Sequence, residues 1–223
     1  MNKSIIIFGT GSFAQLMHYY FAVDSVYSVS AFTVDLAYVT SPSFCGLPVV
    51  PFERLRDYYP PTGFAMFAAV GYRGMRARQA VFERAKSAGY HMISYVSSRS
   101  LYFGDITIGQ NNVVMGHVQI EPFTTIGENN VFWSGTLIAH GVSIGNGNYF
   151  GARCVVGGNS TIENSCFLGN GTVTINEIAL RNETHTLPGT VLLRSTKPFC
   201  KYVGNPGREI GTHKEKGIII ERG

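Results

Sequence analysis

The hydrophobic positions in the second half of the chain recur every six residues, a period that belongs neither to an α-helix nor to an alternating strand. From Ile108 onward, thirteen of the fifteen residues reached in steps of six are apolar. A second series of mostly small residues follows four positions after them: Val118, Thr124, Thr136, Val142, Cys154, Ser160, Cys166, Thr172, Thr184, Thr190 and Thr196. This pattern predicts stacked coils of short strands, with large aliphatic side chains inward and small ones beside them.

The length of one coil follows from a second regularity. Two columns of asparagines recur at a spacing of 18: Asn112, Asn130 and Asn148, and then Asn146, Asn164 and Asn182. We expect them at tight corners, where asparagine tolerates left-handed backbone and stacked amides hydrogen-bond along a column. Fifteen hexads, residues 108–197, therefore predict five triangular coils of 18 residues. Cys154 and Cys166 fall in the small inward series, which makes them core spacers.

Residues 4–96 follow a different pattern, in which strand-like and helix-like segments alternate. The predicted strands are Ser4–Gly9, Ser28–Val34, Phe64–Gly71 and His91–Val96, and the predicted helices are Ser12–Phe21, Phe52–Tyr58 and Arg73–Ala88. This alternation predicts a small α/β domain with a parallel sheet. We place this domain at residues 1–96 and the β-helix with its tail at residues 97–223.

The turn after the first strand has the spacing G-x-G-x-x-A, from Gly9 to Ala14. Gly9 and Gly11 let the backbone approach a phosphate, and the N–H groups at Ser12 and Phe13 open a helix whose N-terminus attracts anions. Asp35 ends the second strand, where a carboxylate can accept hydrogen bonds from ribose hydroxyls. The alternative interpretation is a tight strand-to-helix turn without a ligand.

Composition narrows the class of protein. Of the 223 residues, 45% are hydrophobic and 14% are charged, which indicates an ordered globular protein. The four cysteines have no metal-binding spacing, and no apolar run resembles a membrane span or a signal peptide, so we expect reduced thiols and a cytoplasmic protein. The net charge of +4 lies in the last 43 residues. This excess suits either a solvated face or a ligand with several phosphates, and it does not suit nucleic acid.

One histidine stands out in the repeat. His140 is the third residue of its hexad in the stretch IAHGVSIGNGN, which is neither the large nor the small inward position. We therefore expect its imidazole to project from the surface near a corner, either as a functional group or as an ordinary exposed histidine.

Three stretches carry a family resemblance: Gly9–Ala14, the I-x-H-x-x-x-I-G segment Ile138–Gly145, and Val203–Arg208, which is similar to the G-N-P-A-[KR] ending of hexapeptide acetyltransferases. The chain resembles bacterial nucleotide-aminosugar N-acetyltransferases and the related sialic-acid O-acetyltransferases. The resemblance implies a Rossmann-like N-terminal domain, a left-handed parallel β-helix, a homotrimer, and acetyl-CoA between adjacent β-helices. The implied substrate is a nucleotide-linked amino-dideoxy sugar of bacterial surface glycans such as the lipopolysaccharide O-antigen, and no metal is implied.

The resemblance also implies roles for particular residues. His140 matches the general base, and the backbone N–H of Gly158, one coil above, matches the group that polarises the thioester carbonyl. Tyr149 stands where the family has a histidine near the cofactor, and Gly141 stands where the family often has an acid or a second histidine, so Glu121 is the candidate partner of His140. Lys201 and Arg208 are assigned to the phosphates of acetyl-CoA. Gly71 and Tyr72 complete the substrate-binding set with Gly9, Gly11, Ser12, Phe13 and Asp35.

Other functions fit the sequence less well. O-acetyl transfer to a sugar hydroxyl would use the same base, and a scaffold that binds sugar nucleotides would keep the fold without the chemistry. A β-helical carbonic anhydrase needs three histidines close together, whereas His185 lies more than two coils from His140. A nicotinamide-dependent oxidoreductase would share the glycine turn but would need a second catalytic domain.

Overall fold

The computed structural model describes residues 3–103 and 105–220, which divide into two compact units. The first unit is residues 1–71 and 80–95, and the second is residues 72–79 and 96–223. The long segment of the second unit begins at Val96, whereas the sequence analysis placed residue 96 in the first domain, and the second unit also includes Tyr72–Gln79. No helix among the described residues is both long and apolar enough to cross a membrane.

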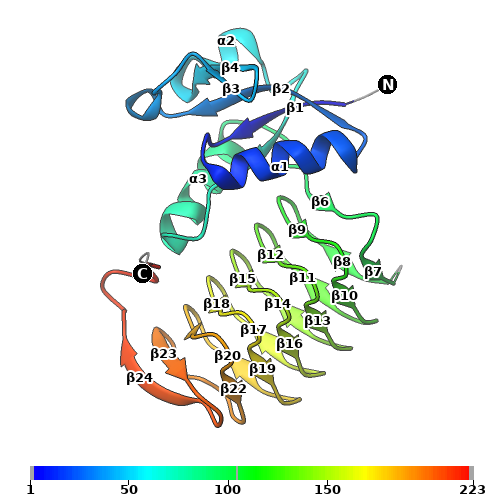
Figure 1. Cartoon of the computed structure of the whole chain (residues 1–223), viewed down its shortest axis with the longest axis vertical. Coiled ribbons are helices and arrows are strands. Elements are labelled where there is room, and N and C mark those ends of the chain that lie inside the picture. Colours follow the sequence, from blue (N-terminus) through cyan, green and yellow to red (C-terminus); the bar gives the residue numbers. More distant parts are fainter. Residues whose placement is uncertain (1–2, 104, 221–223) are drawn as a thin grey trace. The chain divides into compact units, whose positions relative to one another are not determined.

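The first unit is the predicted small α/β domain (Figure 1). Its strands are β1 (Lys3–Phe8), β2 (Tyr27–Val34), β3 (Ser43–Phe44), β4 (Leu47–Pro51) and β5 (Ala65–Ala68), and its helices are α1 (Ser12–Val23), α2 (Leu55–Tyr58) and the second part of α3 (Met75–Ser87), with 3-10 turns at Leu36–Tyr38 and Phe52–Arg54. The sheet order is β3-β4-β2-β1-β5, parallel except for the β3–β4 hairpin, which the sequence analysis missed.

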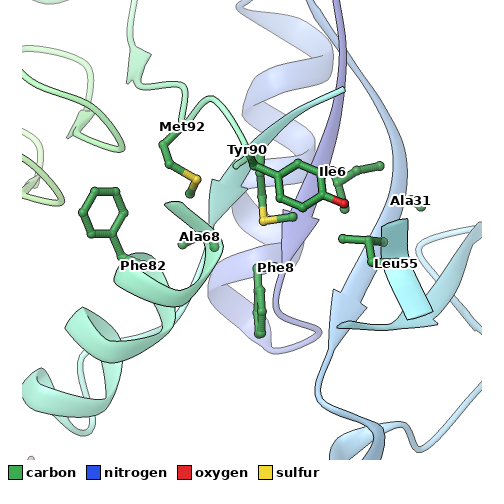
Figure 2. Packing of buried hydrophobic residues seen from close by; sticks show 10 residues of the cluster. Ile6, Phe8, Ala31, Leu55, Ala68, Phe82, Tyr90 and Met92 are labelled. Carbon is green, nitrogen blue, oxygen red and sulfur yellow. The ribbon is translucent and has the colours of Figure 1, made fainter. Parts of the chain in front are cut away.

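The hydrophobic core of this unit is formed by residues of its strands and helices that are far apart in the sequence. Figure 2 shows Ile6 and Phe8 of β1 with Leu55, Phe82 and Met92, all at most 4% exposed. The predicted strand His91–Val96 was only partly right, because Met92 forms an isolated bridge with Met66 and β6 (Tyr95–Val96) joins a sheet of the β-helix.

The second unit is the left-handed parallel β-helix that the period of six predicts. Sixteen two-residue strands, β7 to β22, follow one another every six residues: Leu101–Tyr102, Thr107–Ile108, Val113–Val114, Gln119–Ile120, Thr125–Ile126, Val131–Phe132, Leu137–Ile138, Ser143–Ile144, Tyr149–Phe150, Val155–Val156, Thr161–Ile162, Phe167–Leu168, Val173–Thr174, Ala179–Leu180, His185–Thr186 and Val191–Leu192. The chain then adds β23 (Cys200–Val203) and β24 (Arg208–Thr212). The repeat therefore starts one hexad earlier than predicted.

Three sheets form the faces of this prism, and the strands from β6 to β22 pair with strands 18 residues away. The first sheet contains β7, β10, β13, β16, β19 and β22, and the second contains β8, β11, β14, β17 and β20. The third contains β6, β9, β12, β15, β18, β21, β23 and β24. The small inward series is fully buried as predicted, and burial raises the pKa of the Cys166 thiol to about 12, which keeps it protonated.

The corners of the coils need one left-handed residue per hexad. A positive φ recurs every six residues from Asn111 to Gly189, and only some of these positions are glycine. The two predicted asparagine columns are not the left-handed residues, because Asn111, Asn129 and Gly147 directly before the first column take that conformation instead. The predicted hydrogen bonds along the columns are present, however, as in the donation from the Asn148 N–H to Asn130 Oδ1 at 2.8 Å.

Burial decides how much each asparagine contributes to stability. Asn130 is fully buried, and its amide donates to Asn112 Oδ1 and to the Gly145 carbonyl while its Oδ1 accepts from Asn148. Asn146 accepts the same kind of bond, from the Glu128 N–H at 2.8 Å, but it is exposed.

Asn130→Ala should lower the free energy of unfolding by about 2–4 kcal/mol, because its buried partners lose their hydrogen bonds. Asn146→Ala should lower it by less than about 1 kcal/mol. Denaturant titrations of the two variants measure this, and equal losses would contradict it.

Candidate functional site

His140 lies at the corner where the first sheet passes to the second, between β13 and β14, and it is exposed as predicted. Its backbone N–H donates to Glu121 Oε2 at 3.0 Å. The other carboxylate oxygen of Glu121 accepts from the Gln119 side chain at 3.5 Å. Glu121 thus lies beside His140, but it holds the main chain of this corner rather than the imidazole.

The imidazole of His140 lies against Gly158, one coil further along. A Cβ added to Gly158 would be 3.0 Å from His140 Nε2 and 3.1 Å from Cε1, so even alanine would press on the ring. The N–H of Gly158 donates to Asn176 Oδ1 at 2.9 Å. A thioester carbonyl could accept from this N–H, the role predicted for Gly158, only by displacing the Asn176 side chain.

Asparagine side chains hydrogen-bond successive coils at several corners, and Gly158 stands at a corner where this bond is not made. Two positions after a strand, an asparagine side chain accepts from the backbone N–H one coil below it, as Asn146, Asn164, Asn182, Asn170 and Asn176 do. One coil above His140 this position is Gly158, which has no side chain to accept from the backbone N–H of His140. Glu121 accepts from that N–H instead. We call His140, Gly158, Asn176 and Glu121 the histidine corner.

Gly158→Ala should displace the His140 ring by a few tenths of an ångström and shift its imidazole proton resonances. Gly116 provides a matched control, because it occupies the same hexad position and its added Cβ would meet neighbours only at 3.6 Å. Neither glycine has a positive φ, so alanine strains neither backbone. Imidazole NMR spectra of the two variants make the comparison, and an unmoved His140 signal in Gly158→Ala would show that the ring is placed by something else.

The third sheet carries a separate hollow of about 860 Å³, which we call the aromatic groove. Its lining consists of Tyr72, Trp133, Tyr149, Ala152, Phe167, Gly169, Asn170, His185, Thr186, Leu187, Pro188, Lys201, Ile219 and Ile220. The rings of Tyr149 and Phe167 stack at 5.1 Å with an angle of 7°, and Tyr72 lies 5.1 Å from Tyr149. Trp133 donates its indole N–H to the Tyr149 hydroxyl. Flat apolar surface of this kind binds rings by stacking.

The polar end of the groove is basic. Lys201 lies there beside His185, whose pKa falls to about 4 through burial and then through the positive charges of Lys201 and His213. His185 is therefore neutral near pH 7. A second hollow, also about 860 Å³, shares His185 and Lys201 and adds Lys214 and Lys216. The two hollows together place aromatic surface next to positive charge, which suits a phosphorylated ring compound.

The structure separates two residues that the sequence grouped together. His140 is at the corner between the first and second sheets, whereas Tyr149 lies on the third sheet, the opposite face of the prism. Lys201 lies on that third sheet with Tyr149. Arg208, at the start of β24, is exposed and is not among the residues that line the groove.

In the first unit, the glycine turn follows β1 and leads into α1. Gly9 has φ +131° and its added Cβ would meet the Ala69 carbonyl at 2.8 Å, so this glycine is required by packing alone. Gly11 caps α1, and a Cβ there would enter open space, as expected for a position that a ligand can approach. Ser12 and Phe13 form the first turn of α1.

Asp35 already has a partner within the chain. Both of its oxygens accept from Arg84, in a two-point ion pair with one distance of 3.1 Å. Hydrogen bonding to Asp35 raises the pKa of Arg84, so the guanidinium stays charged. Gly71 follows β5 in this unit, whereas Tyr72 belongs to the second unit and lines the aromatic groove.

Sequence reasoning missed several residues of these sites. Phe167 and His185 are first residues of their strands, and their outward position was readable from the hexad pattern. Arg78 had no such signal: it is 2% exposed and donates to the Asn129 and Gly147 carbonyls, which fixes Tyr72–Gln79 to the β-helix. Burial lowers the pKa of Arg78 to about 10.

Among the described residues, no group of three His, Cys, Asp or Glu side chains is arranged to hold a metal ion.

Comparison with known proteins agrees with the β-helical fold. Residues 105–140 match the bacterial transferase hexapeptide (six repeats) family. No curated protein sequence is similar enough to count as a match.

Solved structures extend the likeness to both units. A variant of perosamine N-acetyltransferase from Caulobacter crescentus, in complex with CoA and GDP-perosamine, is 20% identical with a TM-score of 0.84, over 93% of this chain and 97% of that one. The acetyltransferase domain of PglB from Neisseria gonorrhoeae is 18% identical with a TM-score of 0.82, over 94% and 100%. WeeI from Acinetobacter baumannii is 17% identical with a TM-score of 0.60, over 93% and 100%. This chain therefore shares their fold.

Proposed function

We propose that this protein is an acetyl-CoA-dependent N-acetyltransferase that acts on the amino group of a nucleotide-linked amino-dideoxy sugar. The observation that carries the proposal is the exposed imidazole of His140, seated on a glycine at a corner of a hexapeptide β-helix. Proteins of the same fold support the proposal. One is a perosamine N-acetyltransferase in complex with CoA and GDP-perosamine, and another is the acetyltransferase domain of PglB. The pathway we propose is bacterial surface glycan synthesis, with the enzyme in the cytoplasm.

In this mechanism His140 is the general base. The sugar amine attacks the thioester carbonyl carbon, a C–N bond forms, and the C–S bond breaks. His140 accepts the proton that the amine loses, and the CoA thiolate leaves and is protonated. An imidazole is suited to this step because it gains and loses a proton near neutral pH.

The ligands we propose lie in different parts of the molecule. Acetyl-CoA would lie along the aromatic groove with its phosphates near Lys201, and the sugar nucleotide would meet the Gly9–Phe13 turn, where a ribose would share Asp35 with Arg84. Since His140 and the groove occupy opposite sides of one prism, the reaction needs the His140 of one copy beside the groove of another. This supports an active homotrimer in which Trp133 and Tyr149 face the neighbouring copy.

Purified protein incubated with acetyl-CoA and a panel of nucleotide-linked 3- and 4-amino sugars tests the proposal. Release of the CoA thiol is followed, with the matching hydroxy sugars as controls. Turnover with amines alone supports N-acetylation, and turnover with hydroxy sugars indicates O-acetylation. Binding of sugar nucleotides without thiol release would indicate a scaffold.

His140→Asn should lower kcat about 10²–10⁴-fold, because the proton of the attacking amine has no acceptor. Circular dichroism and the unfolding midpoint should match the wild type, since the side chain is exposed and Glu121 holds only its backbone. A variant that retains more than half of the wild-type kcat would refute the assignment of His140.

Lys201→Ala and Arg208→Ala form a second matched pair. Lys201→Ala should raise the KM for acetyl-CoA by up to about fivefold, the effect of one partly exposed ion contact, and should leave the KM for acetyl-pantetheine unchanged because that donor lacks the nucleotide phosphates. Arg208→Ala should change neither, because Arg208 lies outside the groove. A KM for acetyl-CoA that rises in Arg208→Ala and not in Lys201→Ala would instead place the phosphates of the cofactor beside β24.

A further inference from the structure

The N–H of Gly158 is already used within the chain, and this leaves the proposed acetyl transfer without its expected donor. When an amine attacks a thioester, the carbonyl oxygen gains negative charge, which it returns when the C–S bond breaks. Enzymes place a hydrogen-bond donor at this oxygen. At the histidine corner the Gly158 N–H points instead to Asn176 Oδ1 at 2.9 Å.

This bond fixes how the Asn176 side chain is oriented. A backbone N–H can only donate, so the amide oxygen of Asn176 faces Gly158 and the Nδ2 amino group faces away from it. Asn176 is exposed, and within residues 3–103 and 105–220 its Nδ2 donates to no other group. Asn176 lies two coils after His140, and both side chains lie next to Gly158 on the coil between them. A thioester carbonyl that contacts this donor would therefore lie beside the imidazole.

We propose that the side-chain amide of Asn176, rather than the backbone N–H of Gly158, donates the hydrogen bond to the thioester carbonyl oxygen. The inference rests on the proposed function. The Gly158 N–H then has an indirect part: by donating to Asn176 Oδ1, it holds the amide with its N–H bonds directed outward, and it polarises the amide so that they donate more strongly. Gly158 also leaves the space in which the imidazole lies, so one residue without a side chain positions both the base and the donor.

Two substitutions of Asn176 separate this proposal from the alternative. Asn176→Asp keeps an oxygen for the Gly158 N–H and removes the donor, whereas Asn176→Ala removes the donor and frees the Gly158 N–H. Both should lower kcat by about 10–100-fold, which lies below the usual loss of about 10²–10³-fold for such a donor because this site is exposed. The matched control is Asn146→Ala, which loses the same kind of bond at a corner away from His140.

A structural role for Asn176 would have other consequences. Free CoA has no thioester carbonyl, so its inhibition constant should be the same for Asn176→Ala and the wild type if the lost bond is the one to the carbonyl. A weaker CoA affinity that parallels the loss of kcat would overturn the proposal, since it would indicate a distorted corner. An Asn176→Ala kcat equal to or above that of the wild type would also overturn it, and would assign the donor to Gly158.

The proposed function and this role fail in different ways. A wild-type protein that releases no CoA thiol with any acceptor of the panel overturns both. A wild-type protein that turns over, together with an Asn176→Ala variant that is as active, overturns only the role of Asn176.

Discussion

The constraint on which this structure depends is the backbone hydrogen bonding between successive coils. The N–H of Val131 donates to the carbonyl of Asn148 at 2.9 Å, and the N–H of Leu137 donates to Cys154 at 2.8 Å, in a register that repeats along the prism. Each side chain therefore has fixed neighbours 18 residues before and after it. The requirement for one left-handed residue per hexad follows from the same register, because every coil must turn at the same three places.

Within such a register, a site is made by leaving out a side chain. The asparagines two positions after a strand close the gap between coils, and Gly158 opens it. The imidazole of His140 occupies the space, and Glu121 accepts the backbone N–H that an asparagine at 158 would otherwise have bonded. Asn176 makes such a bond one coil later. The hydrogen-bonded coils on both sides keep the histidine corner in place.

The aromatic groove comes from the outward positions of the third sheet. Tyr149, Phe167 and His185 lie on three successive coils, so the rings of neighbouring coils are stacked or edge-on as a direct result of the register. The groove faces away from the histidine corner, because a triangular coil places each corner opposite a face. The acyl transfer that we propose uses both and would therefore need a second copy of the chain.

The sequence by itself determined the parts of the structure that repeat. The period of six predicted the β-helix and its buried small series, and the position of His140 in its hexad predicted that the ring is exposed, because identical local rules act in every coil. It could not show that Arg84 occupies Asp35, that Arg78 fixes Tyr72–Gln79 to the β-helix, or that Asn176 takes the Gly158 N–H. These contacts depend on which polar groups meet in space, and several could have bonded to water or to other partners. Only the tertiary structure decides among such alternatives, because each hydrogen bond gains little over its competitor in water and is selected by geometry.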